Sequence, residues 1–181
     1  MNRCSWVNLN NPLYVKYHDE EWGVPSYDDD YLFEMLVLES FQAGLSWECI
    51  LNKRKAFYKA FDCFKYEIIA KYDDNKINEL INNKDIVRNK RKILATINNA
   101  KVFINIRNEY KSFSNYIWSF TNNKTLYNNG LVTSNELSDT ISKDLKKRGM
   151  AFVGTTIVYS YLQAIGVIND HEKTCDYRKK D

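Results

Sequence analysis

The stretch Tyr31-Leu-Phe-Glu-Met-Leu-Val-Leu-Glu-Ser-Phe-Gln-Ala-Gly-Leu-Ser-Trp47 predicts the central helix of this protein. Apolar residues fall on nearly every side of a helix drawn over residues 28–43, which is typical of a helix buried within a domain. Gly44 is expected to end this helix, and Ser46 can cap a second helix that begins near Trp47. We therefore expect the rest of the chain to pack around residues 28–43.

One carboxylate interrupts this apolar surface. Glu39 lies on the same helical stripe as Leu32, Leu36 and Ala43, where an apolar side chain would be expected. A buried carboxylate is costly unless something binds it. Because Trp47 follows at the helix junction, Glu39 indicates a pocket lined by rings. The alternative is that Glu39 faces solvent or pairs with a lysine.

Length and composition indicate one globular domain over residues 1–181. The chain is 44% hydrophobic and 27% charged, which is ordinary for a folded protein, and its net charge of +3 permits a nucleic-acid partner without requiring one. We find no signal peptide and no membrane span, and we expect a cytoplasmic monomer without a membrane partner. In that compartment the four cysteines are expected to be free or metal-bound.

The remaining elements are also predicted to be helical, so the fold class is all-α. Residues 1–27 look irregular because Asn10-Asn-Pro12 and Trp22-Gly-Val-Pro25 are turn signals. Thr133 and Glu136 fit a capping box that would start a helix ending at Arg148. No strand pair is predicted, and residues 121–132 are expected to form a polar loop. The other expected helices cover 46–61, 65–71, a segment from 73 or 74 to 81, 90–109, 112–120 and a last segment ending at 165.

A basic turn is predicted between two of these helices. Residues 82–92 surround Ile86-Val87 and carry five cations with a single acid, Asp85. Such a turn can present cations and backbone N–H groups to a phosphate strand. The alternative is that these charges only solvate a loop. The cations are Lys84, Arg88, Lys90, Arg91 and Lys92.

Both ends of the chain carry a histidine and a cysteine. Cys4 and His18 lie near the N-terminus, and His171 and Cys175 are four positions apart, a spacing that would place both on one face of a helical turn. Two Cys and two His form a closed tetrahedral zinc set, so we expect one structural zinc ion that joins the two ends. The alternative is a chance scatter of four residues. Cys49 and Cys63 are expected to be buried packing residues.

Nine motifs together resemble the 3-methyladenine DNA glycosylase I family over nearly the whole chain. They are Arg3-Cys-x-Trp-Val7, Pro12-Leu-Tyr-x-x-Tyr-His-Asp19, Glu21-Trp-Gly-Val-Pro25, Leu32-Phe-Glu-Met35, Leu38-Glu39, Gln42-Ala-Gly-Leu-Ser-Trp47, Lys146-Lys-Arg-Gly149, Phe152-Val-Gly-Thr-Thr-Ile157 and Val167-Ile-Asn-Asp-His171. The resemblance implies an all-helical helix-hairpin-helix DNA glycosylase fold with a zinc site that joins the termini. It also assigns the zinc ligands to Cys4, His18, His171 and Cys175.

The resemblance implies a monofunctional enzyme of base excision repair. Such an enzyme flips an alkylated adenine out of double-stranded DNA, hydrolyses its N-glycosidic bond and releases free 3-methyladenine without cutting the strand. Glu39, in its ionised form, would then recognise the base and be the catalytic residue. The base would be surrounded by Tyr14, Tyr17, Trp22 and Trp47.

The resemblance makes the turn at 83–88 a DNA-binding hairpin, with Lys84, Arg88 and Lys90 as the expected phosphate contacts. Leu45 could fill the gap left by the flipped base, or it could simply pack. Family members usually have Gly at the position of Asp85, and an acid there should weaken DNA binding unless it points away. The chain also ends only six residues after Cys175. Two other functions fit the same residues: a non-catalytic, zinc-stapled DNA-binding module, and a glycosylase for another lesion.

Overall fold

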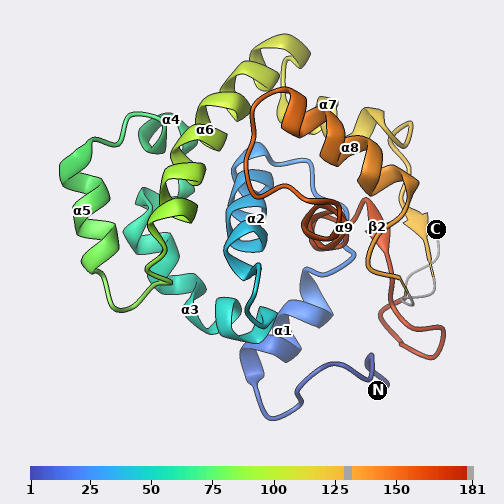
Figure 1. Cartoon of the computed structure of the whole chain (residues 1–181). Helices are drawn as coiled ribbons and strands as arrows, with labels where there is room; N and C mark the ends of the chain where they lie inside the picture. The colour runs from blue at the N-terminus through green and yellow to red at the C-terminus, as the bar shows by residue number, and fades with distance from the viewer. Residues whose placement is uncertain (129–131, 179–181) are drawn as a thin grey trace.

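Helices make up most of the computed structural model, which describes residues 1–128 and 132–178 (Figure 1). In chain order the elements are α1 Pro12–Glu20, α2 Asp29–Gln42, α3 Trp47–Ala60, the 3₁₀ turn η1 Asp62–Phe64, α4 Tyr66–Ile69, α5 Asp74–Asn82, α6 Lys90–Tyr110, α7 Phe113–Ser119, β1 Leu126–Tyr127, α8 Glu136–Lys147, α9 Thr155–Ala164 and β2 Ile168–Asn169. The predicted all-α class is thus confirmed for the described residues, apart from one short strand pair.

The predicted central helix is α2. Its residues from Leu32 to Phe41 are buried except Glu34, and it contacts α3, α6, α7 and α9. The ring of Phe41 meets that of Phe57 on α3 with centroids 4.8 Å apart. Asp28 caps its first turn, as its side chain accepts a hydrogen bond from Asp30 N. Every side of α2 is therefore covered by another element, which explains why its sequence has no polar face.

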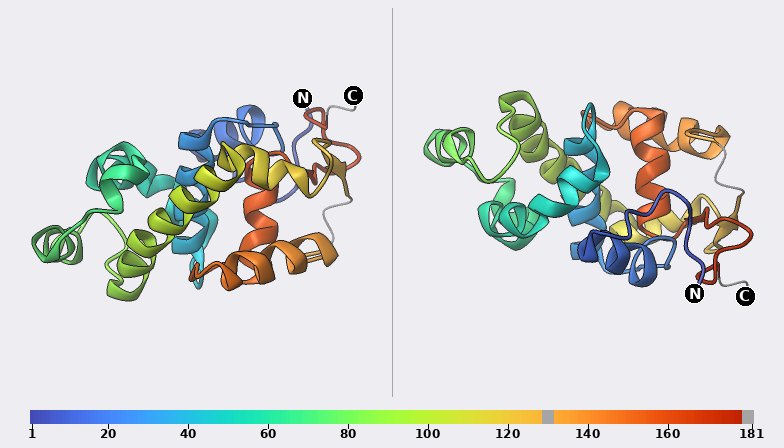
Figure 2. Two further views of the ribbon diagram at one scale, coloured as in Figure 1. Left: turned by 90° about the horizontal axis from the view of Figure 1, so that it is seen from above. Right: turned by 90° about the horizontal axis from the view of Figure 1, so that it is seen from below.

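Two groups of helices flank α2 (Figure 2). On one side α3, α4, α5 and α6 pack together, and α5 leads through the turn at residues 83–89 into α6. On the other side lie α8 and α9, which pack against each other, with the strand pair beside α9. The helix–turn–helix arrangement predicted around residues 83–88 is present.

The two end segments lie side by side in both views of Figure 2. The backbone N of Asn2 donates to Asp176 Oδ2 at 2.7 Å, and Asp176 N donates to Asn2 O at 2.9 Å. No helix in the described ranges is both long and apolar enough to cross a bilayer.

The N-terminal region is less irregular than predicted. Residues 12–20 form α1, and Asn11 caps it by accepting a hydrogen bond from Leu13 N at 3.1 Å. The turn predicted from Asn10-Asn-Pro12 is instead the start of a helix at Pro12. Proline also suits the first turn of a helix, where its missing N–H has no intrahelical partner.

The start of α8 also differs from the prediction. Thr133 does not cap it; instead Asn135 accepts from Ser138 N, and Ser138 Oγ accepts from Asn135 N, both at 2.9 Å. This reciprocal pair satisfies two free amides, so the helix begins at Glu136 rather than at Thr133.

The prediction of no strand pair was wrong in one place. Leu126–Tyr127, within the region expected to be a polar loop, pairs in parallel with Ile168–Asn169. Strands of two residues are too short to show an alternating pattern. Residues 129–131 of that predicted loop, and residues 179–181 of the tail, lie outside the described part of the chain.

The expected burial of the two remaining cysteines is not observed. Cys63 is exposed in η1 with a backbone φ of 58°, and Cys49 is only partly buried. The helical pattern ends at Ala60, one turn before Cys63, so the apolar periodicity did not extend to it.

Candidate functional site

A cavity of about 280 Å³ opens beside the C-terminal half of α2. Its walls come from the N-terminal segment, α1, the junction between α2 and α3, and α9. Every residue predicted to surround a bound base lines it. These are Tyr14, Tyr17, Trp22, Glu39 and Trp47.

Glu39 is the buried acid of this cavity. Glu39 is only 3% exposed, and its Oε2 has no hydrogen-bond partner among the described residues. Burial raises the pKa of Glu39 to about 8, since desolvation disfavours the charged form. Burial therefore favours the protonated carboxyl, and the ionised form expected from the sequence requires a cation beside it. Nε1 of Trp47, in the same cavity, also has no partner within the described ranges.

Rings form the walls around Glu39. Tyr17 and Trp47 meet with ring centroids 5.1 Å apart, and Trp6 packs against Tyr14 and Trp22 at 5.4 and 4.7 Å. Trp6 lines the cavity although no motif assigned it there. Its place two residues after Cys4 is the signal that could have identified it.

The wall formed by α9 is polar. The hydroxyl of Tyr159 and the amide Nε2 of Gln163 both donate to Oδ2 of Asp170 at 2.7 Å. These three residues line the cavity, and sequence reasoning missed them. The four-residue spacing of Tyr159 and Gln163 would have placed them on one face of the last helix.

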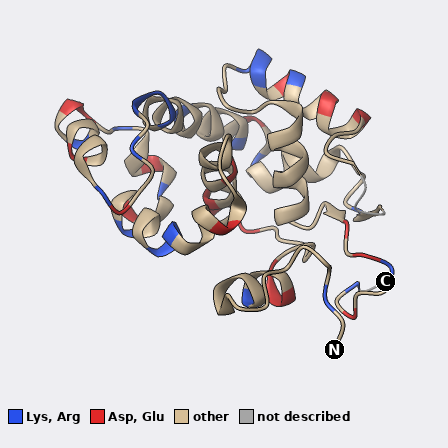
Figure 3. Cartoon of the chain, turned by 60° about the horizontal axis from the view of Figure 1, so that its bottom comes forward, with Lys and Arg blue, Asp and Glu red and all other residues tan. Residues whose placement is uncertain are grey.

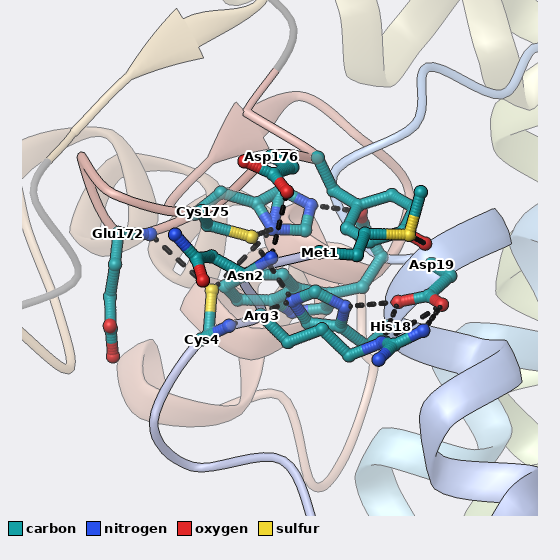
Figure 4. Close-up of polar contacts among 12 residues, drawn as sticks. Met1, Asn2, Arg3, Cys4, His18, Asp19, Glu172, Cys175 and Asp176 are labelled. Atoms are coloured by element: carbon teal, nitrogen blue, oxygen red, sulfur yellow. Dashed lines mark hydrogen bonds and ion pairs between the residues drawn. The ribbon is translucent and has the colours of Figure 1, made fainter. Parts of the chain in front are cut away.

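The four residues predicted to bind a metal come together in one cluster, of which Figure 4 labels Cys4, His18 and Cys175. All four are buried, and their ligand atoms lie within 4.8 Å of one another. Nδ1 of His171 is 3.6 Å from Sγ of Cys4 and 3.7 Å from Sγ of Cys175, and Nε2 of His18 is 3.5 Å from Sγ of Cys175. The expectation of a metal site joining the two ends therefore has a compact donor cluster to support it.

The outer nitrogen of each histidine is held by another group. Nδ1 of His18 lies 2.8 Å from Oδ1 of Asp19, whose carboxylate also accepts from Arg3, with Nη2 to Oδ2 at 2.7 Å. Nε2 of His171 lies 3.0 Å from the carbonyl oxygen of Trp22. These partners fix both rings with the other nitrogen facing the sulfurs, as outer contacts do in metal sites. Asp19 and Arg3 were not predicted, although Asp19 follows His18 directly.

The protonation preferences of the cluster suit a bound cation. Burial lowers the pKa of His171 to about 4, so its imidazole is neutral and has a lone pair to give. Burial raises the pKa of Cys4 to about 12, so its thiol needs a nearby cation to become a thiolate ligand. One detail of the prediction is wrong: His171 and Cys175 are brought together by a turn, in which Cys175 N donates to Glu172 O at 2.9 Å, and not by a helix.

The turn at residues 83–89 and the start of α6 carry exposed basic residues, and Figure 3 marks the Lys and Arg positions of the chain in blue. Ile86 is buried and anchors the turn, while Lys53 donates to the carbonyl of Asp85 at 3.0 Å. The backbone N of Asp85 donates to Asn83 Oδ1 at 2.9 Å. The exposed cations are Lys84, Arg88, Lys90 and Arg91.

Lys92 does not belong to this exposed group, contrary to the sequence prediction. It is only 6% exposed, and its Nζ donates to the carbonyls of Phe41 at 2.8 Å and Ala43 at 2.6 Å.

Leu45, two residues after Ala43 at the junction of α2 and α3, is 41% exposed. Gly44 precedes it with a φ of +81°, a conformation that glycine adopts without strain.

Comparison with known proteins gives a consistent result. A model of the methyladenine glycosylase family matches residues 6–179. DNA-3-methyladenine glycosylase 1 of Escherichia coli (strain K12) is 42% identical over 97% of this chain and 96% of its own length. DNA-3-methyladenine glycosylase of Haemophilus influenzae is 39% identical over 96% of each chain.

A solved structure agrees in fold as well. That of 3-methyladenine DNA glycosylase I from Staphylococcus aureus, described as the structural basis of 3-methyladenine recognition, superposes with a TM-score of 0.94 and 36% sequence identity, covering 100% of this chain and 98% of the other. A ring-lined cavity with an unpartnered acid, four clustered metal-ligand residues and these matches agree with one another. The chain belongs to the methyladenine glycosylase family.

Proposed function

We propose that this protein is a DNA-3-methyladenine glycosylase of base excision repair. It would take an alkylated adenine, flipped out of double-stranded DNA, into the cavity beside Glu39 and hydrolyse its N-glycosidic bond. The observation that carries this proposal is the unpartnered carboxyl of Glu39 inside a cavity of aromatic walls. At about 280 Å³ the cavity lies just below the range of roughly 300–1,000 Å³ for small-molecule sites, which favours one base over a whole nucleotide.

Charge and ring contacts support selection of a methylated base. Adenine methylated at N3 carries a positive charge while it is attached to the sugar, and the faces of Trp47 and Tyr17 attract a desolvated cation. A cation in the cavity also lowers the pKa of Glu39, so that the ionised carboxylate can accept a hydrogen bond from the exocyclic amine. Unmodified adenine has the amine but no charge, and its binding would leave the carboxyl protonated. Glu39 thus discriminates through its own ionisation.

The reaction needs little acid catalysis. Water adds to C1′ of the sugar as the bond to N9 breaks, the bonding electrons leave with the base, and the added water loses a proton. The departing base is neutral because the electrons cancel its charge, so it leaves readily. Catalysis then rests mainly on holding the base and sugar in the reactive geometry.

Strand cleavage is not expected. A Schiff-base mechanism needs a free lysine at the reacting sugar. Lys92 is the only lysine that is buried in the described part of the chain, and its Nζ is bound to two carbonyls and does not line the cavity. We therefore propose a monofunctional hydrolase that leaves an abasic site.

We further propose that the buried cluster holds one structural zinc ion. With Zn–S near 2.3 Å and Zn–N near 2.05 Å, a tetrahedral site has sulfur–nitrogen edges of about 3.6 Å. The three sulfur–nitrogen separations in the cluster are 3.6, 3.7 and 3.5 Å. Four protein ligands leave no open position, so the ion would supply a cross-link between the two ends of the chain rather than chemistry. Its ligands would be Cys4, His18, His171 and Cys175.

DNA contact is proposed at the basic turn and at the α2–α3 junction. Lys84, Arg88 and Lys90 are exposed where cations could meet the phosphates of one strand. Leu45 is an exposed apolar side chain next to the cavity, suited to fill the space left by a flipped base.

One assay tests the central proposal. Duplex DNA treated with a methylating agent is incubated with the protein, and free bases are separated by chromatography. Release of 3-methyladenine is expected. Binding to the DNA with no release of any base would leave a DNA-binding module, and release of other bases alone would indicate another lesion.

A further inference from the structure

The side chain of Lys92 connects the start of α6 to the end of α2. Lys92 is the third residue of α6, and its backbone N donates to the capping side chain of Asn89 at 3.2 Å. Its Nζ reaches across to the carbonyls of Phe41 and Ala43, the last turn of α2 and the residue that follows it. The Lys92 side chain thus links the start of α6, which follows the basic turn, to the junction at residues 43–46.

This placement is costly for Lys92 itself. A lysine is rarely this buried without an acidic partner, and none lies within ion-pair distance among the residues described. A cation in the first turn of a helix also faces the positive end of that helix's dipole. At the end of α2 the opposite holds, because the last carbonyls of a helix lack N–H partners and carry the negative end of the dipole. The favourable interactions of Lys92 are therefore those with α2.

The end of α2 that Lys92 holds carries the functional groups of the site. Glu39 lies one turn before Ala43, and Gln42 lines the cavity. Leu45 lies three residues after Gln42, and its backbone N donates to Gln42 O at 2.7 Å. Because Ala43 leaves the helical conformation with ψ 115° and Gly44 has φ +81°, the path of residues 43–45 is not fixed by helical hydrogen bonds.

A second set of contacts joins α6 and α2 through residues 151–152. Asn99 accepts from Ala151 N at 2.9 Å and donates to Ala151 O at 2.8 Å, while Ser40 Oγ on α2 donates to Phe152 O at 3.2 Å. The ammonium of Lys92 lies 5.9 Å from the centre of the Phe152 ring. These contacts keep α6 beside α2 further along, so Lys92 is needed for the local path of residues 43–45 and not for the packing of the two helices.

From this geometry we propose that Lys92 is a positioning residue that holds residues 43–45 in register with the basic turn at residues 83–89. When DNA phosphates dock on Lys84, Arg88 and Lys90, the buried ammonium places Leu45 at a fixed distance from that strand, so docking and base flipping occur together. Lys92 itself contacts neither DNA nor base. This inference rests on the proposed glycosylase function and adds a link between its two surfaces.

The test variant is Lys92→Met, which removes the ammonium group and keeps an unbranched apolar side chain. Lys101→Met is the matched control, because Lys101 lies on the same helix and is exposed. We expect Lys92→Met to lower the single-turnover rate of 3-methyladenine release from saturating duplex DNA by about tenfold or more, the size of effect given by loss of hydrogen bonds from a charged donor. Affinity for undamaged duplex and for free 3-methyladenine should change less than about threefold, since neither binding surface is altered.

Two further measurements separate positioning from general damage. The fluorescence of 2-aminopurine placed beside the target base reports flipping, and Lys92→Met should reduce its increase on binding. Hydrogen exchange at the amides of residues 44–46 should be faster in Lys92→Met than in the wild type or Lys101→Met, with exchange in the core of α2 unchanged. Should Lys92→Met not fold, Lys92→Gln removes the charge and keeps a donor, and the same pattern is expected with smaller size.

The proposal is overturned if release, duplex affinity and free-base affinity all fall in the same proportion, or if release and the exchange of residues 44–46 both match the wild type. A wild-type protein that releases no base would sink the glycosylase function instead. The exchange measurement would still test the role of Lys92, because it does not depend on activity.

Discussion

The carbonyl oxygen of Trp22 lies 3.0 Å from Nε2 of His171, and the rings of the two residues meet edge to face with centroids 4.6 Å apart. Trp22 also lines the cavity that contains Glu39. A wall of this cavity and a residue of the Cys/His cluster are therefore in direct contact. Whatever fixes His171 also fixes Trp22.

Loss of one residue of the proposed metal cluster should therefore affect both stability and base binding. We expect Cys175→Ser to lower bound zinc, measured by atomic emission, and to lower the midpoint of thermal unfolding, because metal binding contributes directly to folding free energy. Affinity for free 3-methyladenine should fall with them as Trp22 loses its support. Cys63→Ser is the control, since Cys63 is exposed and outside the cluster. Unchanged zinc content in Cys175→Ser would remove this residue from the site.

Replacing the buried acid should separate catalysis from DNA binding. Glu39→Gln keeps the shape of the side chain but cannot ionise when a cationic base enters. Release of 3-methyladenine should fall by about 10- to 100-fold, the effect of losing a charge-assisted hydrogen bond, while affinity for undamaged duplex stays within about twofold. Glu136→Gln, at an exposed position of α8, should change neither. Equal losses of release and DNA affinity in Glu39→Gln would argue against its role.

The protonation of Glu39 should also be visible in stability without any substrate. Its pKa rises from 4.5 in the unfolded chain to about 8 in the fold. A raised pKa stabilises the fold fully below the unfolded value, and that contribution is lost as pH rises through about 8. At about 1.36 kcal/mol per pKa unit the loss is up to about 5 kcal/mol. Denaturant unfolding from pH 5 to 9 should therefore show the wild type losing stability relative to Glu39→Gln, and parallel curves would contradict a buried neutral carboxyl.

Charge reversal at the basic turn should weaken binding to any DNA sequence. We expect Arg88→Glu to lower duplex affinity and to reduce the slope of log affinity against log salt by roughly 0.9 for each phosphate contact that is lost. Binding of free 3-methyladenine should not change. Lys101→Glu makes the same charge change on an exposed part of α6 away from the turn, and a loss as large as that of Arg88→Glu would show that net charge alone is responsible.

The acid within the same turn should act in the opposite direction. Asp85 is exposed among four exposed cations, so its carboxylate repels the phosphates they attract. Asp85→Asn is expected to tighten duplex binding a few-fold at low salt, with a smaller gain at high salt because of screening. Fluorescence anisotropy at two salt concentrations measures both. Equal affinity of the two proteins at low salt would mean that Asp85 points away from DNA.

The sequence alone predicts a structural feature correctly where burial leaves a periodic pattern or a characteristic set of residue types. The apolar surface of α2 identified the core and singled out Glu39, and the pairing of Cys with His at both ends identified the cluster. Both inferences depend on residue type and spacing, which the sequence records directly.

Contacts made across the fold could not be predicted in the same way. Lys92 stands in a run of basic residues and looks like a solvated cation, and only the packing of α6 against α2 reveals its two carbonyl partners. A proline such as Pro12 occurs both in turns and in the first turn of a helix, so its residue type does not distinguish the two. The pair β1–β2 joins segments about forty residues apart through two residues each, which leaves no local pattern to detect.

The two halves of the Cys/His cluster lie far apart along the chain, since Cys175 follows His18 by 157 residues. A proteolytic cut that releases residues 171–178 would remove His171, the partner of the Trp22 carbonyl. Clipping at this end of the chain should therefore deform the wall of a cavity built mainly from residues far earlier in the sequence.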